Sequence, residues 1–165
     1  MSSARYRIRA GGAADLADVV QIERETREAP HWAEPEYAAI TNAVEGVMAP
    51  IKRRLFVAEA DERLMGFAVG KVLVSEALIL AELESVAVSA SARRQGVGRA
   101  LCEAVISWCR ELRAAEMELE VRAGSAGAIA LYGGLGFLPV GKRIEYYKGP
   151  VEDALLMQLK LAKNE

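Results

Sequence analysis

The chain has 165 residues, of which 52% are apolar and 27% are charged. This length and composition predict one globular domain, residues 1–165, that can bury a hydrophobic core. The 21 basic and 23 acidic residues nearly balance, which argues against a nucleic-acid-binding protein. No apolar run is long enough to cross a membrane, and no apolar stretch follows the basic N-terminus as it would in a signal peptide. We therefore expect a cytoplasmic protein with no membrane partner.

Alternating and helical spacings of apolar residues predict the elements of the N-terminal half. Leu16, Val19, Val20 and Ile22 show helical spacing, and Pro35 suits the first turn of a second helix. The expected elements are a strand over 6–10, a helix over 15–27, a loop over 28–35, a helix over 36–47, and a hairpin of strands over 55–60 and 64–74.

The C-terminal half continues the same alternation of strands and helices. Its longest helix carries an apolar seam that includes Leu101, Val105 and Trp108. The expected elements are a strand over 81–88, a polar turn over 89–98, a helix ending at Arg113, a strand over 117–122, a helix over 125–135, and strands over 137–147 and 154–161. The order predicts a single α/β or α+β sheet domain.

Neither cysteine chemistry nor metal chemistry is favoured. Cys102 and Cys109 are seven residues apart in the expected long helix, which separates their Cα atoms by about 10 Å. A disulfide needs a Cα separation below about 7 Å, so we expect two buried thiols. With His31 as the only histidine, no zinc site is expected.

The turn between the strand over 81–88 and the long helix predicts an anion site. Free N–H groups at a helix N-terminus attract anions, and Gly96 and Gly98 leave room for a phosphate to reach them. Arg93, Arg94 and Arg99 add positive charge. Because the Gly-Lys-Ser/Thr ending of a P-loop and the dinucleotide-binding fingerprint are both missing, the pattern favours another kind of pyrophosphate.

Arg93-x-x-Gly96-x-Gly98 after a Val-Ala-Val strand resembles the acetyl-CoA motif of the GNAT N-acetyltransferases. The segments 119–123, 128–132 and 135–137 match that family's cofactor region in order and spacing. The resemblance implies the acyl-CoA N-acyltransferase fold, a central mixed sheet with splayed fourth and fifth strands, flanked by helices. It implies acetyl-CoA as cofactor without a metal, bound by Val86, Ala87, Val88, Arg93, Arg94, Gln95, Gly96, Val97, Gly98, Arg99, Ser125 and Tyr132.

Further segments resemble the RimI subfamily, whose members acetylate the N-terminal alanine of a small-subunit ribosomal protein. They include the Pro-Trp loop over 29–37 and the double tyrosine followed by Glu152-Asp153-Ala154. The resemblance implies a protein N-terminus as acceptor, met by Trp32, Tyr37, Glu84, Tyr146 and Tyr147. Two alternatives stay open: an acetyltransferase for a small amine or a lysine side chain, and an acetyl-CoA-binding module without activity.

The resemblance also implies the catalytic roles. An α-ammonium has a pKa near 8 and must lose a proton around its attack on the thioester. Glu120 is the implied base, with Glu84 as its rival, and Tyr132 is the implied acid for the departing thiolate. Backbone N–H groups over 86–88 are the expected donors to the oxyanion. Because the sequence shows no base beside Cys102, we expect direct transfer in a ternary complex.

The sequence departs from the family pattern at Ser125 and at Gly133-Gly134, where two glycines weaken the expected helix after Tyr132. Ser125 stands where many relatives have asparagine. A hydroxyl is shorter than a carboxamide and makes fewer hydrogen bonds, so a weaker contact to CoA is expected here.

Overall fold

The computed structural model describes residues 5–26, 32–41 and 50–161. Seven of its strands form one sheet in the order β1-β2-β3-β4-β5-β7-β6. The elements are β1 (Arg7–Ala10), α1 (Leu16–Glu25), α2 (Glu34–Thr41), β2 (Ile51–Ala60), β3 (Arg63–Val74), β4 (Ile79–Val88), α3 (Val97–Glu111), β5 (Glu116–Arg122), α4 (Ala126–Gly134), β6 (Leu138–Tyr147) and β7 (Glu152–Lys160), with 3-10 turns at Ala13–Asp15 and Ala90–Ala92.

The predicted elements are present, with shifted ends. β2 begins four residues earlier than expected because residues from Ile51 onward pair with β3. α2 begins two residues early, at Glu34, with Pro35 in its first turn. The expected continuation of this helix over 42–47, and loop residues 28–31 with His31, lie outside the described residues.

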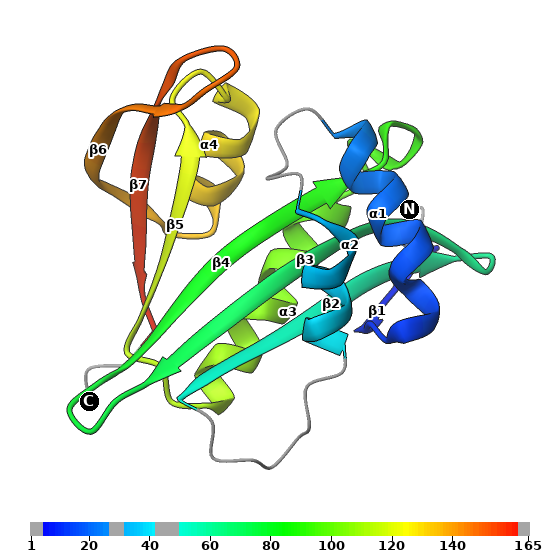
Figure 1. The fold of residues 1–165 in the computed structure, drawn as a ribbon, viewed down its shortest axis with the longest axis horizontal. Helices are drawn as coiled ribbons and strands as arrows, with labels where there is room; N and C mark the ends of the chain where they lie inside the picture. Colours follow the sequence, from blue (N-terminus) through cyan, green and yellow to red (C-terminus); the bar gives the residue numbers. More distant parts are fainter. Residues whose placement is uncertain (1–4, 27–31, 42–49, 162–165) are drawn as a thin grey trace.

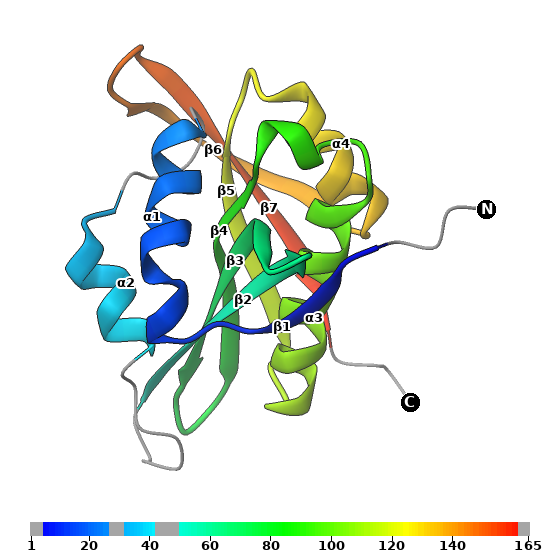
Figure 2. The same ribbon diagram turned by 90° about the vertical axis from the view of Figure 1, so that its right-hand side faces the viewer.

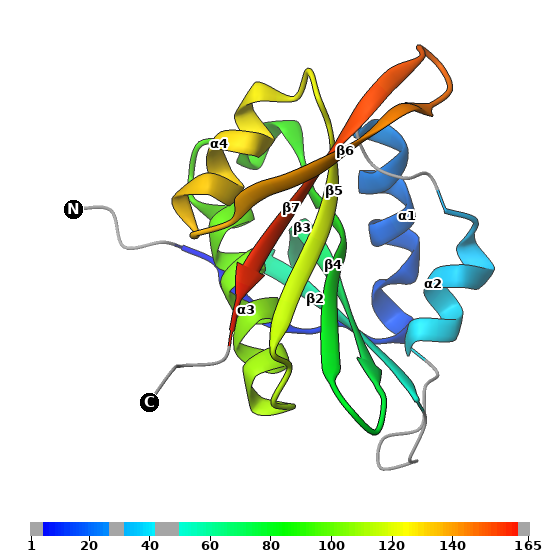
Figure 3. The same cartoon turned by 90° about the vertical axis from the view of Figure 1, so that its left-hand side faces the viewer.

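The sheet is the middle layer of the molecule. α1 and α2 cover one face, and α3 and α4 cover the other (Figures 2 and 3). Successive side chains of a strand point to opposite faces, so β2 supplies both cores. Leu55 and Val57 pack under α1 and α2, whereas Phe56 and Ala58 pack under α3.

Helix α3 lies very close to the sheet. Leu101, Val105 and Trp108 of the predicted seam are buried against β2, β3 and β4. A Cβ atom at Gly70 of β3 would lie 2.7 Å from Cγ1 of Val105. Glycine at this position therefore allows the close approach of helix and strand. Cys102 and Cys109 point into the same core, both are free and buried, and burial raises the pKa of each thiol to about 12.

The central strands β4 and β5 are parallel but separate after a short contact. Only Leu80–Glu82 pair with Glu116–Glu118, while β3 pairs with β4 and β7 pairs with β5 over nearly their full lengths. Beyond the contact the two strands diverge, as Figure 1 shows. The prediction of a mixed sheet with splayed fourth and fifth strands is confirmed.

Candidate active site

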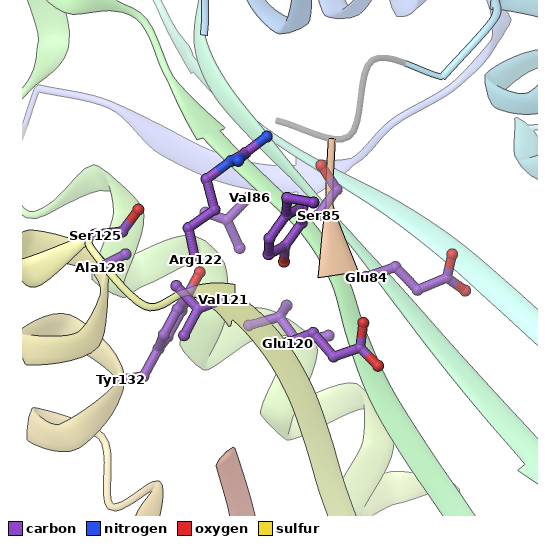
Figure 4. A pocket seen from close by; sticks show the side chains of 11 residues that line it. Glu84, Ser85, Val86, Glu120, Val121, Arg122, Ser125, Ala128 and Tyr132 are labelled. Atoms are coloured by element: carbon purple, nitrogen blue, oxygen red, sulfur yellow. The ribbon is translucent and has the colours of Figure 1, made fainter. Parts of the chain in front are cut away.

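A pocket lies where β4 and β5 part. It encloses about 90 Å³ and is lined by residues of β4, β5, α4 and the end of β6. Figure 4 shows the carboxyl groups of Glu84 and Glu120 on one side of the opening and Ser125 and Tyr132 of α4 on the other. The strands thus bring together residues that are far apart in the sequence. The full lining is Leu83, Glu84, Ser85, Val86, Glu120, Val121, Arg122, Ser125, Ala128, Tyr132 and Tyr147.

The glycine-rich turn leads from the end of β4 into α3. Gly96 is the N-cap residue with φ of 78°, and no side chain in the described residues caps the helix. The first N–H groups of α3 have no partner within the helix and carry partial positive charge. A Cβ atom added at Gly98 would contact only Leu131 and Val88, at 3.5 Å and 3.6 Å. This uncapped, glycine-lined helix start fits the pyrophosphate of CoA.

The basic side chains of the turn are exposed. Arg93 Nε lies 3.5 Å from the carbonyl oxygen of Val88, and Arg99 pairs with Glu103 at 3.0 Å. Arg94 has a positive φ of 64°. The side chain of Gln95 donates a hydrogen bond to the carbonyl oxygen of Ser91. The exposed charges of the turn are therefore the guanidinium groups of Arg93, Arg94 and Arg99.

The side chains at the end of β4 belong to the two cores. Val86 and Val88 pack toward α3, whereas Ala87 is buried toward α1 and α2. Val97, the first residue of α3, is also buried. These expected cofactor residues can therefore meet a ligand mainly through backbone groups. Along this stretch β4 is not paired with β5, so its edge faces the pocket.

A β-bulge interrupts β4 at Glu84. Val69 pairs with Ser85 and the next residue, Gly70, pairs with Leu83, so Glu84 is the extra residue. Bulges redirect side chains and are frequent beside active sites. The Glu84 side chain is only 6% exposed and accepts a hydrogen bond from Arg53 Nε at 2.9 Å.

Glu120 lies on the opposite strand and is more open. Its side chain is 26% exposed, and Oε1 is 3.0 Å from Nε of Arg143 on β6. Three residues of β6, 144–146, lie opposite the single residue Asp153 of β7. Glu145 has a positive φ of 52° there, and its N–H donates to Asp153 at 2.8 Å. Next to this irregularity, Arg143 pairs with Glu120 and Tyr146 interacts with the same carboxylate.

The paired tyrosines end β6 beside this carboxylate. Their rings meet edge to face with centroids 5.1 Å apart. A hydrogen bond to Glu120 and its negative charge raise the pKa of Tyr146. Burial, followed by the charge of Glu120, raises the pKa of Tyr147. The guanidinium of Arg122 lies 4.2 Å from the Tyr147 ring centroid, which fixes this ring in the pocket wall.

Helix α4 supplies the opposite wall. Tyr132 is partly buried and lines the pocket, with its ring edge to face against Phe137 at 6.0 Å. Ser125 is the N-cap residue of α4, but its hydroxyl makes no capping bond. Ser125 also lines the pocket, so its hydroxyl lies where a ligand of the pocket would pass.

The other two expected aromatic residues lie apart from the tyrosine pair. Trp32 is partly buried and packs on Tyr37 with ring centroids 5.3 Å apart. Tyr37 is fully buried and contacts Phe67. The Tyr37 ring therefore belongs to the core under α2 and presents no surface to a ligand. The aromatic residues form two groups, on either side of the split.

Sequence reasoning did not single out three groups near the pocket. Arg53 of β2 pairs with Glu84, and Arg143 of β6 pairs with Glu120. Both contacts depend on how distant strands are placed in the sheet. The third is Glu82, which lies two residues before the bulge residue Glu84 on β4. Burial raises its pKa, and the charges of Glu84 and Glu120 raise it further. The alternation Glu82-x-Glu84 was visible in the sequence, but the bulge that changes its geometry was not.

A split sheet with a glycine-rich, uncapped helix start at one end and ionisable side chains at the other is typical of enzymes that move acyl groups from CoA to amines. The sequence comparison agrees. A family model described as "Acetyltransferase (GNAT) family" matches residues 16–137. The chain belongs to this family and is an acetyl-CoA-dependent N-acetyltransferase.

Relatives within the family are similar over most of their length. The "[Ribosomal protein bS18]-alanine N-acetyltransferase" of Escherichia coli K12 is 33% identical over 150 residues, 90% of this chain and 93% of the relative. The "N-alpha-acetyltransferase" of Sulfurisphaera tokodaii is 34% identical over 92% of this chain and 91% of its own. The crystal structure of the E. coli ribosomal-protein-S18-alanine N-acetyltransferase has a TM-score of 0.76 at 30% identity, covering 97% of this chain and 96% of that one.

Two further observations concern the described residues alone. They contain no helix long and apolar enough to span a membrane. Among them, no three His, Cys, Asp or Glu side chains are grouped so that they could hold a metal ion.

Proposed function

We propose that this protein transfers the acetyl group of acetyl-CoA to the N-terminal α-amine of a protein, and that its acceptor is the N-terminal alanine of a small-subunit ribosomal protein. The names of the similar enzymes support this acceptor. The observation that carries the proposal is the pocket at the split, where Glu120 and Tyr132 face one opening from different elements. Such an acceptor would be met in the cytoplasm.

In this proposal the binding sites for acetyl-CoA and for the acceptor lie on different sides of the split. The uncapped start of α3, with Gly96 and Gly98, would hold the pyrophosphate of CoA. The β6–β7 hairpin leans over the face that carries α1 and α2 (Figures 2 and 3), so the acceptor would enter between the hairpin and these helices. Backbone groups along the unpaired edge of β4, over 86–88, would bind the pantetheine arm between them.

Acetyl-CoA supplies a thioester carbonyl that an amine nitrogen can attack, with a thiolate as leaving group. Glu120 would take the proton that the acceptor amine must lose, because its carboxylate is partly exposed at the opening. Backbone N–H groups of β4 would donate to the carbonyl oxygen as its negative charge develops. Glu120 thus gains one proton as the new C–N bond forms.

Tyr132 would protonate the departing sulfur as the C–S bond breaks, and its phenol would recover a proton from solvent. The opposite placement of Glu120 and Tyr132 suits this division, since one group serves the entering nitrogen and the other serves the leaving sulfur. The buried thiols of Cys102 and Cys109 keep raised pKa values. Neither is reactive enough to carry an acyl group, which favours direct transfer.

The test is acetylation of a hexapeptide that begins with alanine and contains one internal lysine. We expect mass spectrometry to find one acetyl group, on the α-nitrogen. A peptide blocked at its N-terminus is the matched control and should stay unmodified. Acetylation of its lysine, or equal rates with free small amines, would contradict the proposal. Binding of CoA without turnover on any amine would indicate a non-catalytic module.

A further inference from the structure

Glu152 begins β7, and the mechanism above gives it no role. With Asp153 and Ala154 it forms the segment that comes after the paired tyrosines. The start of β7 lies at the same end of the sheet as the turn from β5 to α4, which follows the pocket residue Arg122 (Figure 1). The backbones of the two segments meet there, since the Ala123 N–H donates to the carbonyl oxygen of Asp153 at 2.9 Å. Glu152 is therefore placed beside the pocket.

One oxygen of the Glu152 carboxylate is anchored on the backbone of this turn. Its Oε2 accepts the N–H of Gly124 at 2.6 Å, and hydrogen bonds from backbone N–H groups to a carboxylate are among the strong ones. A Cβ atom at Gly124 would lie 2.6 Å from the same oxygen. The φ angle of Gly124 is not positive. Glycine at this position therefore serves the close approach of the carboxylate rather than an unusual turn.

The other oxygen faces an arginine of the pocket. Oε1 of Glu152 lies 3.5 Å from Nη1 of Arg122, and the side chains are 27% exposed for Glu152 and 21% for Arg122. The Arg122 guanidinium lies in turn 4.2 Å from the centroid of the Tyr147 ring. A guanidinium over an aromatic face is attracted to it, more strongly where water is partly excluded. Arg122 and Tyr147 both line the pocket, so the contacts that begin at Gly124 end in its wall.

These contacts act in series on one ring. An arginine side chain has many rotamers and loses much freedom when it is held in one, so a fixed carboxylate is needed to keep its guanidinium over the ring. The Glu152 carboxylate is fixed because Gly124 holds its second oxygen. Tyr147 is thereby kept half-buried in the pocket wall. The first turn of α3, where the pyrophosphate of CoA would bind, takes no part in this series.

Resting on the proposed function, we propose that Glu152 is a positioning residue for the amine acceptor. Anchored on Gly124, its carboxylate holds Arg122 against the Tyr147 ring, and this ring forms the part of the wall that the first residue of the acceptor would meet. Glu152 thus acts on the binding of the acceptor and not on proton transfer or on the binding of CoA.

The first test compares Glu152→Gln with the unmodified enzyme. Glutamine still accepts the Gly124 N–H through its carbonyl oxygen, but it presents a neutral amide to Arg122. We expect the KM for the alanine peptide to rise about fivefold, as for the loss of a partly buried cation–π contact. The values of kcat and of the affinity for CoA should stay within about twofold, because the proposed base, acid and cofactor turn are intact. An unchanged acceptor KM would overturn the inference.

Gly124→Ala disturbs the same carboxylate at its anchor. The added Cβ atom would displace Oε2 of Glu152, so the acceptor KM should rise by a similar factor. Because both changes interrupt one series of contacts, the variant that combines Gly124→Ala with Glu152→Gln should be no worse than the poorer single variant. Effects that multiply would mean that the two residues act independently, which would contradict the inference.

Glu116→Gln is the matched control. Glu116 is also a carboxylate of β5 that bonds to β7, with Oε2 2.6 Å from Nε2 of Gln158. It lies at the other end of β5 and does not line the pocket. Both KM values should therefore stay unchanged in this variant. An acceptor KM that rises equally in Glu116→Gln would reflect a general loosening between β5 and β7 and would also overturn the inference.

A second readout needs no acceptor. An aromatic ring shifts the NMR signals of protons above its face upfield, so the Arg122 Nε–H signal reports the contact with Tyr147, and Tyr147→Leu identifies it. We expect Glu152→Gln to lose most of this upfield shift and Glu116→Gln to keep it. A shift that persists in Glu152→Gln would refute the inference, whatever the enzyme acetylates. If the shift is lost but no protein N-terminus is acetylated, the proposed function fails and the placement of Tyr147 by Glu152 stands.

Discussion

Each side of the split carries a glutamate that pairs with an arginine. The two pairs differ in the exposure of the glutamate and in the strand that supplies the arginine. Glu84 on β4 is 6% exposed and pairs with Arg53 of β2, within the continuous part of the sheet. Glu120 on β5 is 26% exposed and pairs with Arg143 of the edge strand β6. A similar ion pair is thus enclosed on one side and accessible on the other.

This difference indicates how the same residue type can serve two purposes. A base for an incoming amine must be within hydrogen-bond reach of it, which favours the more exposed Glu120 over Glu84. The enclosed Glu84 is held by its bulge and by Arg53, which suits a structural ion pair. The predictions below test this division.

The largest effect in this set is expected for Tyr132→Phe, which removes the proposed acid and keeps the ring packed on Phe137. We expect kcat to fall about 100-fold, within the usual range for loss of an acid–base group. A thioester with a more acidic leaving thiol should be affected much less. Tyr6→Phe, at the cofactor turn, is the control and should keep its kcat. An unchanged kcat in Tyr132→Phe would disprove the assignment.

Glu84→Gln should affect stability more than rate. The change weakens a charged hydrogen bond to Arg53, so urea denaturation should show a loss of about 1–2 kcal/mol. The rate constant kcat should fall less than about threefold, because Glu84 takes no proton in this account. Arg53→Met should produce a similar loss of stability. A fall in kcat of tenfold or more at unchanged stability would assign Glu84 to the chemistry.

Arg143→Met should have a smaller effect, and in the favourable direction. The guanidinium occupies the carboxylate that the acceptor ammonium must approach, and an exposed pair of this kind is worth about 0.2–1 kcal/mol. We therefore expect the acceptor KM to fall about threefold at low salt. Lys142→Met on the same strand is the control. A higher KM in Arg143→Met would mean that Arg143 binds the acceptor instead.

The smallest effect concerns the titration of Tyr146. Its hydrogen bond to Glu120 favours the protonated phenol, so its pKa lies above the ordinary value near 10. Tyr37 and Tyr147 also have raised pKa values, so ultraviolet titration should show several tyrosines ionising late, and Glu120→Gln should move the Tyr146 step toward lower pH. Tyr146→Phe identifies the step by removing it. A step that does not move in Glu120→Gln would contradict the contact.

Much of this fold could be predicted from the sequence, because local patterns determine it. The helical seam from Leu101 to Trp108 and the glycines at 96 and 98 require no knowledge of distant residues. The ends of elements were less predictable. β2 starts at Ile51 because residues of β3 pair with it there. The first residues of β2 are mostly charged, so they lack the alternation of apolar residues that would predict a strand.

The site could be predicted only in part. The family motif brings Glu120 and Tyr132 to one pocket, as expected from their positions on a strand and the next helix. Tyr37 was expected beside the acceptor but lies in the core, since exposure depends on what packs over a ring. Arg143 of β6 pairs with Glu120 of β5, although the two strands are separated by β7, and a single sequence does not reveal which side chains meet across strands that are not neighbours.

The most direct test of the central claim is a single-turnover comparison of Glu120→Gln and Glu84→Gln. Both are measured at saturating acetyl-CoA with the alanine peptide, after calorimetry has shown equal affinity for CoA. The account predicts that acetyl transfer is at least about 100-fold slower in Glu120→Gln than in Glu84→Gln, because only the former lacks the base. Equal rates, or a slower Glu84→Gln, would contradict it.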